Sequence, residues 1–327
     1  MDDALRQPES KVQPVRVLPQ LEAHRQEARA GGVDDLVGFR AFYTRDVLLF
    51  GAVAGPEDGT PVVLLHGFPD FWLGWARQIR PLVEAGCRVL IPDQRGYNRS
   101  EKPPGIDAYR LPELSADIID LLDAVGWESA HLAGHDWGAA VSWSLADHHP
   151  ERLESVTILN CPHPDEMARA LLGNNRRQML RSWYIGLFQL PHLPEWVARA
   201  SDFRFLEMAL SSASPGAFTD DELAAYRRAW GQEGALTAMI NWYRAAGRAA
   251  LGGGDATSET PSNGAKIEVP LRIVWGRDDK ALDESLVEPS AERAEDARIE
   301  WVDDASHWVR RDAPEVVNRA LLETVGS

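Results

Sequence analysis

The stretch Gly134-His135-Asp136-Trp137-Gly138 has the residue types of a sharp turn that presents a reactive carboxylate. Apolar residues precede the turn, and Ala139–Ala146, which favour a helix, follow it. A glycine on either side lets the backbone turn where a side chain would clash. Strand, tight turn and helix together form the frame of a nucleophile elbow, which usually holds a serine. Here the central residue is Asp136.

The exchange of serine for aspartate changes the chemistry that such a turn can perform. A carboxylate is already ionised at neutral pH, so it needs no base in order to attack. Attack on an acyl carbon would give an anhydride, whereas attack on a saturated carbon with a leaving group gives an alkyl ester. Asp136 as nucleophile therefore implies a covalent ester and a separate hydrolytic step, with epoxides or haloalkanes as substrates. The alternative is an aspartate that only caps the following helix.

Hydrolysis of such an ester needs a base that activates water, and histidine suits this role. His307 follows the last predicted strand, and an acid that orients its imidazole should precede it in the chain. Asp278 and Asp279 both follow the strand Leu271–Trp275, and one of them is expected to be that acid. The order nucleophile, acid, histidine is the order found in α/β-hydrolases. A solvent-exposed loop histidine and two turn aspartates are the alternative interpretation.

Ester hydrolysis also places negative charge on an oxygen, which backbone N–H groups can stabilise. Trp137, directly after the expected nucleophile, offers one such group. The turn that begins at His66 offers the other, most simply from Phe68, because the proline that follows has no N–H. We predict that His66 supports this turn and is not a catalytic base.

Short apolar strands alternate with helical segments along most of the chain, which predicts an α/β fold. The predicted fold is a mostly parallel eight-stranded sheet with helices on both faces and a helical insertion. The site should lie at the carboxyl ends of the strands. The strands are predicted at Phe39–Thr44, Val47–Ala54, Pro61–Leu65, Arg88–Pro92, the segment before Gly134, Val156–Asn160, Leu271–Trp275 and Arg298–Val302, and the first two form a hairpin.

Composition divides the chain into five parts. The first part is polar, with a helix predicted at Leu18–Ala30, and is expected to lie on the surface as an arm. A segment with helical periodicity, many aromatic residues and no strand interrupts the α/β pattern, and a glycine-rich linker follows it. The predicted parts are the arm 1–33, the first core part 34–163, the helical cap 164–250, the linker 251–266 and the second core part 267–327.

The chain is acidic, with 50 Asp and Glu against 34 Lys and Arg and a formal net charge of -16. This balance argues against nucleic acid and anionic membrane surfaces as partners. The N-terminal residues do not form a signal peptide, and no apolar run approaches the roughly 18 residues that span a bilayer, so we predict a cytoplasmic protein. Cys87 and Cys161 lie in apolar segments and are expected to be buried thiols. The sequence predicts neither a metal site nor a cofactor.

Three motifs together resemble the epoxide hydrolases of the α/β-hydrolase superfamily. They are His66-Gly67-Phe68-Pro69 with Trp75 downstream, Asp93-Gln94-Arg95-Gly96-Tyr97-Asn98-Arg99-Ser100, and the turn around Asp136. The likeness runs roughly from Phe39 to the C-terminus and leaves the arm without a counterpart. It implies an α/β-hydrolase fold with a helical cap, and it selects Asp279 over Asp278 as the acid.

The resemblance also implies two tyrosines of the cap that donate hydrogen bonds to the epoxide oxygen. Tyr184 stands in a Trp-Tyr…Phe-Gln…Pro pattern, and Tyr243 stands in Asn-Trp-Tyr-Arg. Such donors make physical sense, because an alkoxide leaves poorly unless it is protonated or hydrogen-bonded. On periodicity alone, either tyrosine could equally belong to the core of the cap.

The expected function is hydrolysis of a small apolar epoxide with water to a vicinal diol, without a cofactor. One alternative is a hydrolytic haloalkane or haloacid dehalogenase, which would share Asp136, Asp279 and His307. Against it, Phe68 stands where one dehalogenase group carries a halide-binding asparagine. Another alternative is a member of the fold that binds ligands without turnover. The sequence predicts neither the particular epoxide nor the oligomeric state.

Overall fold

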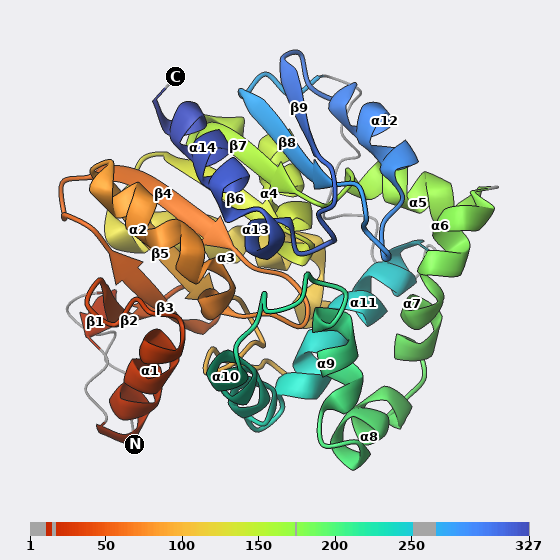
Figure 1. The fold of residues 1–327 in the computed structure, drawn as a ribbon, viewed down its shortest axis with the longest axis horizontal. Helices are drawn as coiled ribbons and strands as arrows, with labels where there is room; N and C mark the ends of the chain where they lie inside the picture. The colour runs from red at the N-terminus through yellow and green to blue at the C-terminus, as the bar shows by residue number, and fades with distance from the viewer. Residues whose placement is uncertain (1–10, 15–17, 174, 251–265, 327) are drawn as a thin grey trace, which may run out of the picture.

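A single mixed sheet organises the computed structural model, which describes residues 11–14, 18–173, 175–250 and 266–326 (Figure 1). The strand order is β1-β2-β3-β5-β4-β6-β7-β8-β9. The strands are β1 (Val12–Pro14), β2 (Val37–Tyr43), β3 (Leu48–Ala54), β4 (Thr60–Leu65), β5 (Cys87–Asp93), β6 (Ala130–His135), β7 (Leu153–Leu159), β8 (Leu271–Gly276) and β9 (Ala297–Val302).

The pairings from β5 through β4, β6, β7 and β8 to β9 are all parallel. At the other edge, β1, β2 and β3 pair antiparallel with one another, and β3 pairs antiparallel with β5. The central strands are rich in apolar residues because helices cover both of their faces; Val63, Leu64 and Leu65 of β4, for example, are fully buried. All eight predicted strands are present, and the first two form the predicted hairpin. The ninth strand, β1, comes from the arm and was not predicted.

Helices cover both faces of the sheet, as the sequence predicted. On one face α2 and α14 pack against each other, and on the opposite face α3 packs against α4 (Figure 1). The predicted helix at Leu111–Val125 is confirmed as α3, with Gly126 in a left-handed conformation at its end. These helices are α2 (Ala76–Glu84), α3 (Leu111–Val125), α4 (Trp137–His148), α12 (Val287–Ala291), α13 (Val309–Asp312) and α14 (Pro314–Val325).

A helical insertion separates β7 from β8, and its helices gather on one side of the sheet (Figure 1). It matches the segment that the sequence predicted as a cap. The predicted linker lies outside the described residues except for Lys266. The helices of the insertion are α5 (Pro164–Leu172), α6 (Arg176–Arg181), α7 (Trp183–Phe188), α8 (Leu193–Ala200), α9 (Arg204–Leu210), α10 (Asp220–Trp230) and α11 (Ala235–Ala250).

The arm is more firmly attached than its polar composition suggested. Its helix α1 (Leu18–Ala30), at the predicted position, packs against α10 of the insertion and against β2 of the core. Glu27 is fully buried, where it accepts hydrogen bonds from Arg99 (2.6 Å) and from the indole of Trp72 (3.0 Å). His24 is buried beside it. The sequence predicted an arm on the surface, and the structure corrects this: the arm contains a helix whose His24 and Glu27 side chains are buried.

Two smaller expectations concern the thiols and the membrane. Cys87 and Cys161 are both buried and free of a disulfide, as predicted. Among the described residues, no helix has the length and apolarity that crossing a membrane requires.

Candidate active site

Asp136 occupies the turn between β6 and α4, with a backbone φ of +52°. This conformation is strained for a residue with a side chain, and such strain is characteristic of functional turns. A side chain at Gly134 would overlap the backbone of Gly138, and one at Gly138 would overlap the backbone of Leu65. The predicted elbow is therefore present, and its glycines are required by close packing.

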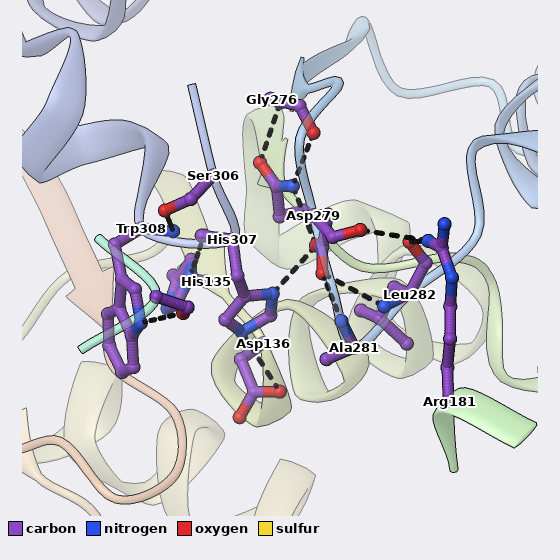
Figure 2. A network of polar contacts seen from close by, with 12 residues as sticks. His135, Asp136, Arg181, Gly276, Asp279, Ala281, Leu282, Ser306, His307 and Trp308 are labelled. Atoms are coloured by element: carbon purple, nitrogen blue, oxygen red, sulfur yellow. Dashed lines mark hydrogen bonds and ion pairs between the residues drawn. The ribbon is translucent and has the colours of Figure 1, made fainter. Parts of the chain in front are cut away.

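His307 and Asp279 lie next to Asp136, in a row that Figure 2 shows. The Nδ1 atom of His307 lies 2.8 Å from Oδ2 of Asp279, and its Nε2 atom lies 3.6 Å from Oδ2 of Asp136. The three residues follow β6, β8 and β9, whose carboxyl ends meet at the same edge of the sheet. Asp278 is exposed and directs no side-chain hydrogen bond toward this row. Of the two predicted acids, the fold thus brings Asp279 to the histidine.

Four donors hold the carboxylate of Asp279 in one orientation. Its Oδ1 atom accepts from the backbone amides of Ala281 (2.7 Å) and Leu282 (2.9 Å). Its Oδ2 atom accepts from His307 and from the side-chain amide of Asn160 (2.8 Å). Because both oxygens are engaged, the side chain cannot rotate without losing hydrogen bonds in a buried site.

Asn160 is a site residue that the sequence analysis did not single out. It follows β7 with a φ of +42°, and its Oδ1 atom accepts from the backbone amide of Gly276 (2.9 Å). That bond fixes which end of its side chain faces Asp279. Its place at the carboxyl end of a central strand was the available signal, but an asparagine there also suits an ordinary turn.

His135 is a second residue that the sequence analysis missed. Its Nε2 atom lies 2.8 Å from the carbonyl oxygen of His307, and the ring centres of the two histidines are 4.7 Å apart with the rings tilted by 55°. Because a carbonyl oxygen can only accept, Nε2 of His135 must carry the proton. Burial lowers the pKa of His135 to about 3, so the ring is neutral and holds the His307 loop against β6.

Charge and burial act in opposite directions on the groups of this row. Burial lowers the pKa of His307, but the carboxylates of Asp279 and Asp136 outweigh it and raise that pKa to about 10. Burial raises the pKa of Asp136, but His307 and the Phe68 amide hold it below its usual value. At neutral pH the site therefore contains an imidazolium between two carboxylates.

Both predicted oxyanion donors lie beside Asp136. The backbone amide of Phe68 donates to Oδ1 of Asp136 at 2.7 Å. Trp137 follows Asp136 as the first residue of α4, so its amide belongs to the positive end of that helix. A side chain at Gly67 would overlap the carboxylate, so this close approach requires glycine. His66 is buried and accepts from the Gln94 amide (3.1 Å), which agrees with its predicted supporting role.

Tyr184 and Tyr243 meet over the elbow although they come from different helices of the insertion. Their rings contact each other edge-on at 5.8 Å. The ring of Tyr243 also packs against Phe68 (5.2 Å) and Trp137 (5.1 Å), the two residues that flank the carboxylate of Asp136. Burial, and then the charge of Asp136, raise the pKa of both tyrosines, so both phenols keep their protons.

Hydrogen bonds from the insertion to core residues attach it on both sides of the site. Asp70, in the loop after Phe68, pairs with Arg310 and accepts a hydrogen bond from Tyr226 of α10 at 2.6 Å. On the other side, Arg181 of α6 donates to the carbonyl oxygen of Asp279 at 2.8 Å. The insertion is thus held at both sides of the row.

Among the described residues, no group of three His, Cys, Asp or Glu side chains could bind a metal ion.

The family model described as the alpha/beta hydrolase fold matches residues 60–313, so the chain belongs to the α/β-hydrolase family. Within it the chain is related to the epoxide hydrolases, as the motifs indicated. It is 32% identical to epoxide hydrolase A of Mycobacterium tuberculosis over 83% of this chain and 92% of that one. A crystal structure of an epoxide hydrolase from Bacillus megaterium with an inhibitor superposes with a TM-score of 0.78, at 27% identity, over 88% of this chain and all of that one.

Another relative is more similar in sequence than these epoxide hydrolases, but its name states no reaction. The AB hydrolase superfamily protein YfhM of Bacillus subtilis is 45% identical over 86% of this chain and 95% of its own length. Family and fold are therefore established, and the reaction is a separate question.

Proposed function

We propose that this protein hydrolyses epoxides to vicinal diols through an ester on Asp136. The observation that carries the proposal is the position of Asp136 between a His307–Asp279 pair and two protonated tyrosines. A carboxylate nucleophile, a base for water and two proton donors are the groups that this reaction needs. Kinship with epoxide hydrolases supports the same assignment.

In the first step, one carboxylate oxygen of Asp136 attacks a ring carbon of the epoxide. The C–O bond to that carbon breaks, and its electron pair goes to the epoxide oxygen. Tyr184 and Tyr243 donate hydrogen bonds to this oxygen as its charge develops, and one of them supplies the proton. The product is an alkyl ester of Asp136 with a free hydroxyl on the neighbouring carbon.

In the second step, water attacks the carboxyl carbon of the ester. His307 takes a proton from the water, and Asp279 stabilises the imidazolium that forms. The amides of Phe68 and Trp137 stabilise the oxyanion of the tetrahedral intermediate. Collapse of the intermediate breaks the ester bond, and the leaving oxygen takes the proton of the intermediate's hydroxyl, which releases the diol and restores the carboxylate of Asp136. The proton that His307 held before the reaction returns the tyrosinate of the first step to a phenol, and the proton taken from water restores the imidazolium.

The electrostatics of the site suit this order of events. In the free enzyme two carboxylates raise the pKa of His307 to about 10, and an imidazolium cannot accept a proton from water. Esterification removes the charge of Asp136, so one of the groups that hold the proton on His307 disappears. The pKa of His307 then falls, and the imidazole becomes a base only after the ester has formed.

The test is to trap the ester in a His307→Gln variant. Because Asp136 needs no base for the first step, the variant should still react with an epoxide, and hydrolysis should stop. Intact-protein mass spectrometry should then show a gain equal to the whole substrate mass, located at Asp136 by peptide mapping. The adduct should be absent from His307→Gln that also carries Asp136→Asn.

The same measurement separates this function from dehalogenation. A haloalkane expels halide, so its adduct would weigh the substrate mass less the halogen. Adducts with haloalkanes alone would overturn the proposal in favour of a dehalogenase. No adduct with either class would favour a member of the fold that binds ligands without turnover.

A further inference from the structure

The exposed apolar side chains of the described residues are unevenly distributed. Among the residues whose burial the structure describes, every large hydrophobic residue that is strongly exposed lies in the helical insertion, and most of them are on α6, α7, α8 or the turn between α7 and α8. We call this set the insertion apolar surface: Leu172, Met179, Leu180, Trp183, Leu190, Leu193, Trp196 and Met208. Single exposed apolar residues are ordinary, but a concentration of them marks an interaction surface.

The helices that carry this surface follow one another in contact. Each of α5 to α8 packs against the next, and α6, α7 and α8 run along one outer edge of the molecule (Figure 1). Leu180 is 77% exposed, Trp183 is 62% exposed and Trp196 is 65% exposed. The largest apolar side chains therefore project from consecutive short helices at the periphery, where no element of the described part of the chain covers them.

The charge around this surface differs from that of the whole chain. Residues 173–210 contain five arginines and three acidic residues, in a chain with a net charge of -16. Two of these acids are already paired within the protein: Glu195 lies 2.7 Å from Arg244, and Glu207 lies 2.5 Å from Arg227. Arg176, Arg199 and Arg204 are exposed, so the neighbourhood of the surface is locally positive.

We propose that the insertion apolar surface docks on a lipid bilayer that contains anionic phospholipids. Exposed tryptophan and leucine with arginine beside them is the composition of segments that lie in a bilayer interface. The arginines can reach lipid phosphates while their stems and the indoles enter the apolar boundary. The overall charge argued against an anionic surface, but charges farther away than about 8 Å are largely screened at physiological ionic strength.

A second copy of the chain fits this surface less well. A twofold dimer places the same patch on both subunits, so the arginines of one copy would face those of the other.

A bilayer also fits the position of the surface relative to the site. The short helix α7 carries exposed Trp183 next to Tyr184, whose ring contacts Tyr243 over the elbow. An apolar substrate dissolved in the bilayer would thus meet the protein close to the site.

The experiment is sedimentation of the full-length protein with vesicles, which measures binding and needs no turnover. Vesicles of phosphatidylcholine alone are compared with vesicles that also contain phosphatidylglycerol, at low and high salt. We expect binding to the anionic vesicles that weakens at high salt. Changing Leu180→Ser together with Trp196→Ser should lower the partition coefficient at least about tenfold.

The charge requirement has a matched control. Arg199→Ser with Arg204→Ser should weaken binding to anionic vesicles, whereas Arg45→Ser with Arg319→Ser, exposed arginines outside the insertion, should not. Binding that ignores lipid charge and salt would overturn the proposal, as would no binding to either vesicle. Self-association that the Leu180 and Trp196 changes abolish, without vesicle binding, would overturn it in favour of a second copy.

Discussion

Replacing Asp279 by asparagine should separate the two steps of the proposed reaction. The backbone amides of Ala281 and Leu282 both donate to Oδ1 of Asp279, so the oxygen of the new amide must take that position. Its NH₂ group then occupies the position of Oδ2 and faces Nδ1 of His307. Because Nδ1 now has to accept, the imidazole proton moves to Nε2, the atom that should take a proton from water.

A 180° rotation of the new amide would not restore the original tautomer of His307. It would direct the NH₂ group at two backbone N–H donors, and a buried donor without an acceptor costs about 1–3 kcal/mol. The side-chain amide of Asn160 cannot rotate to offer its oxygen to the new NH₂ group, because that oxygen accepts from the Gly276 amide at 2.9 Å. The same wrong tautomer costs a serine protease about 10⁴-fold in kcat. We therefore expect ester hydrolysis to fall by about 10⁴, which is about 5.5 kcal/mol in activation free energy.

The assay for Asp279→Asn is single-turnover kinetics with an epoxide, followed by intact-protein mass. Alkylation should proceed at nearly the wild-type rate, and the ester should accumulate. Asp278→Asn is the matched control, since it removes the same charge from an exposed neighbour and should leave both steps unchanged. Hydrolysis within tenfold of wild type, or an equal loss in both steps, would refute the reasoning about the tautomer.

Three further predictions follow from the site and the arm. Asp136→Asn should lower the pKa of His307 from about 10, because one carboxylate that raises it is lost; NMR titration of the imidazole measures this. Tyr184→Phe and Tyr243→Phe should each slow alkylation about a hundredfold, or about 3 kcal/mol, and leave ester hydrolysis unchanged in stopped-flow traces. Glu27→Gln should lower the free energy of unfolding in urea by about 3 kcal/mol, because it leaves a buried arginine without its ion pair.

Each of these predictions has a result that contradicts it. An imidazole that still titrates near pH 10 in Asp136→Asn would mean that the carboxylate does not hold the proton on His307. Tyrosine variants with wild-type alkylation rates would show that the phenols are only packing residues. Glu22→Gln is the control for the arm, because Glu22 is half-exposed on the same helix and lies 3.7 Å from Arg29. Equal loss of stability in both glutamate variants would contradict the buried-pair argument.

The strands and the elbow could be predicted from sequence because their signals are local. Short apolar runs that end in turn residues specify buried parallel strands, and glycines flank Asp136 at fixed offsets. The proximity of Asp279 and His307 to Asp136 could be predicted as well, because each follows a strand of a parallel sheet. In such a sheet the carboxyl ends of the strands lie at one edge, whatever their separation in the chain.

The contacts that escaped the sequence analysis are between polar side chains far apart in the chain. Glu27 looks like any glutamate on a polar helix, and only its bonds to Arg99 and Trp72 explain its burial. Asn160 likewise becomes a site residue only when β7 and β8 are neighbours. Hydrophobic periodicity shows which residues are buried, but it does not show which buried polar groups pair with each other.

The position of the insertion also determines the order in which the sheet is completed during synthesis. β7 is made before the insertion, whereas its neighbour β8 and the helix α14 that packs on both strands are made after it. While the insertion is being translated, apolar β7 is an unpaired edge strand, which is a site for aggregation. This edge of β7 stays open until β8 has been made and has paired with it.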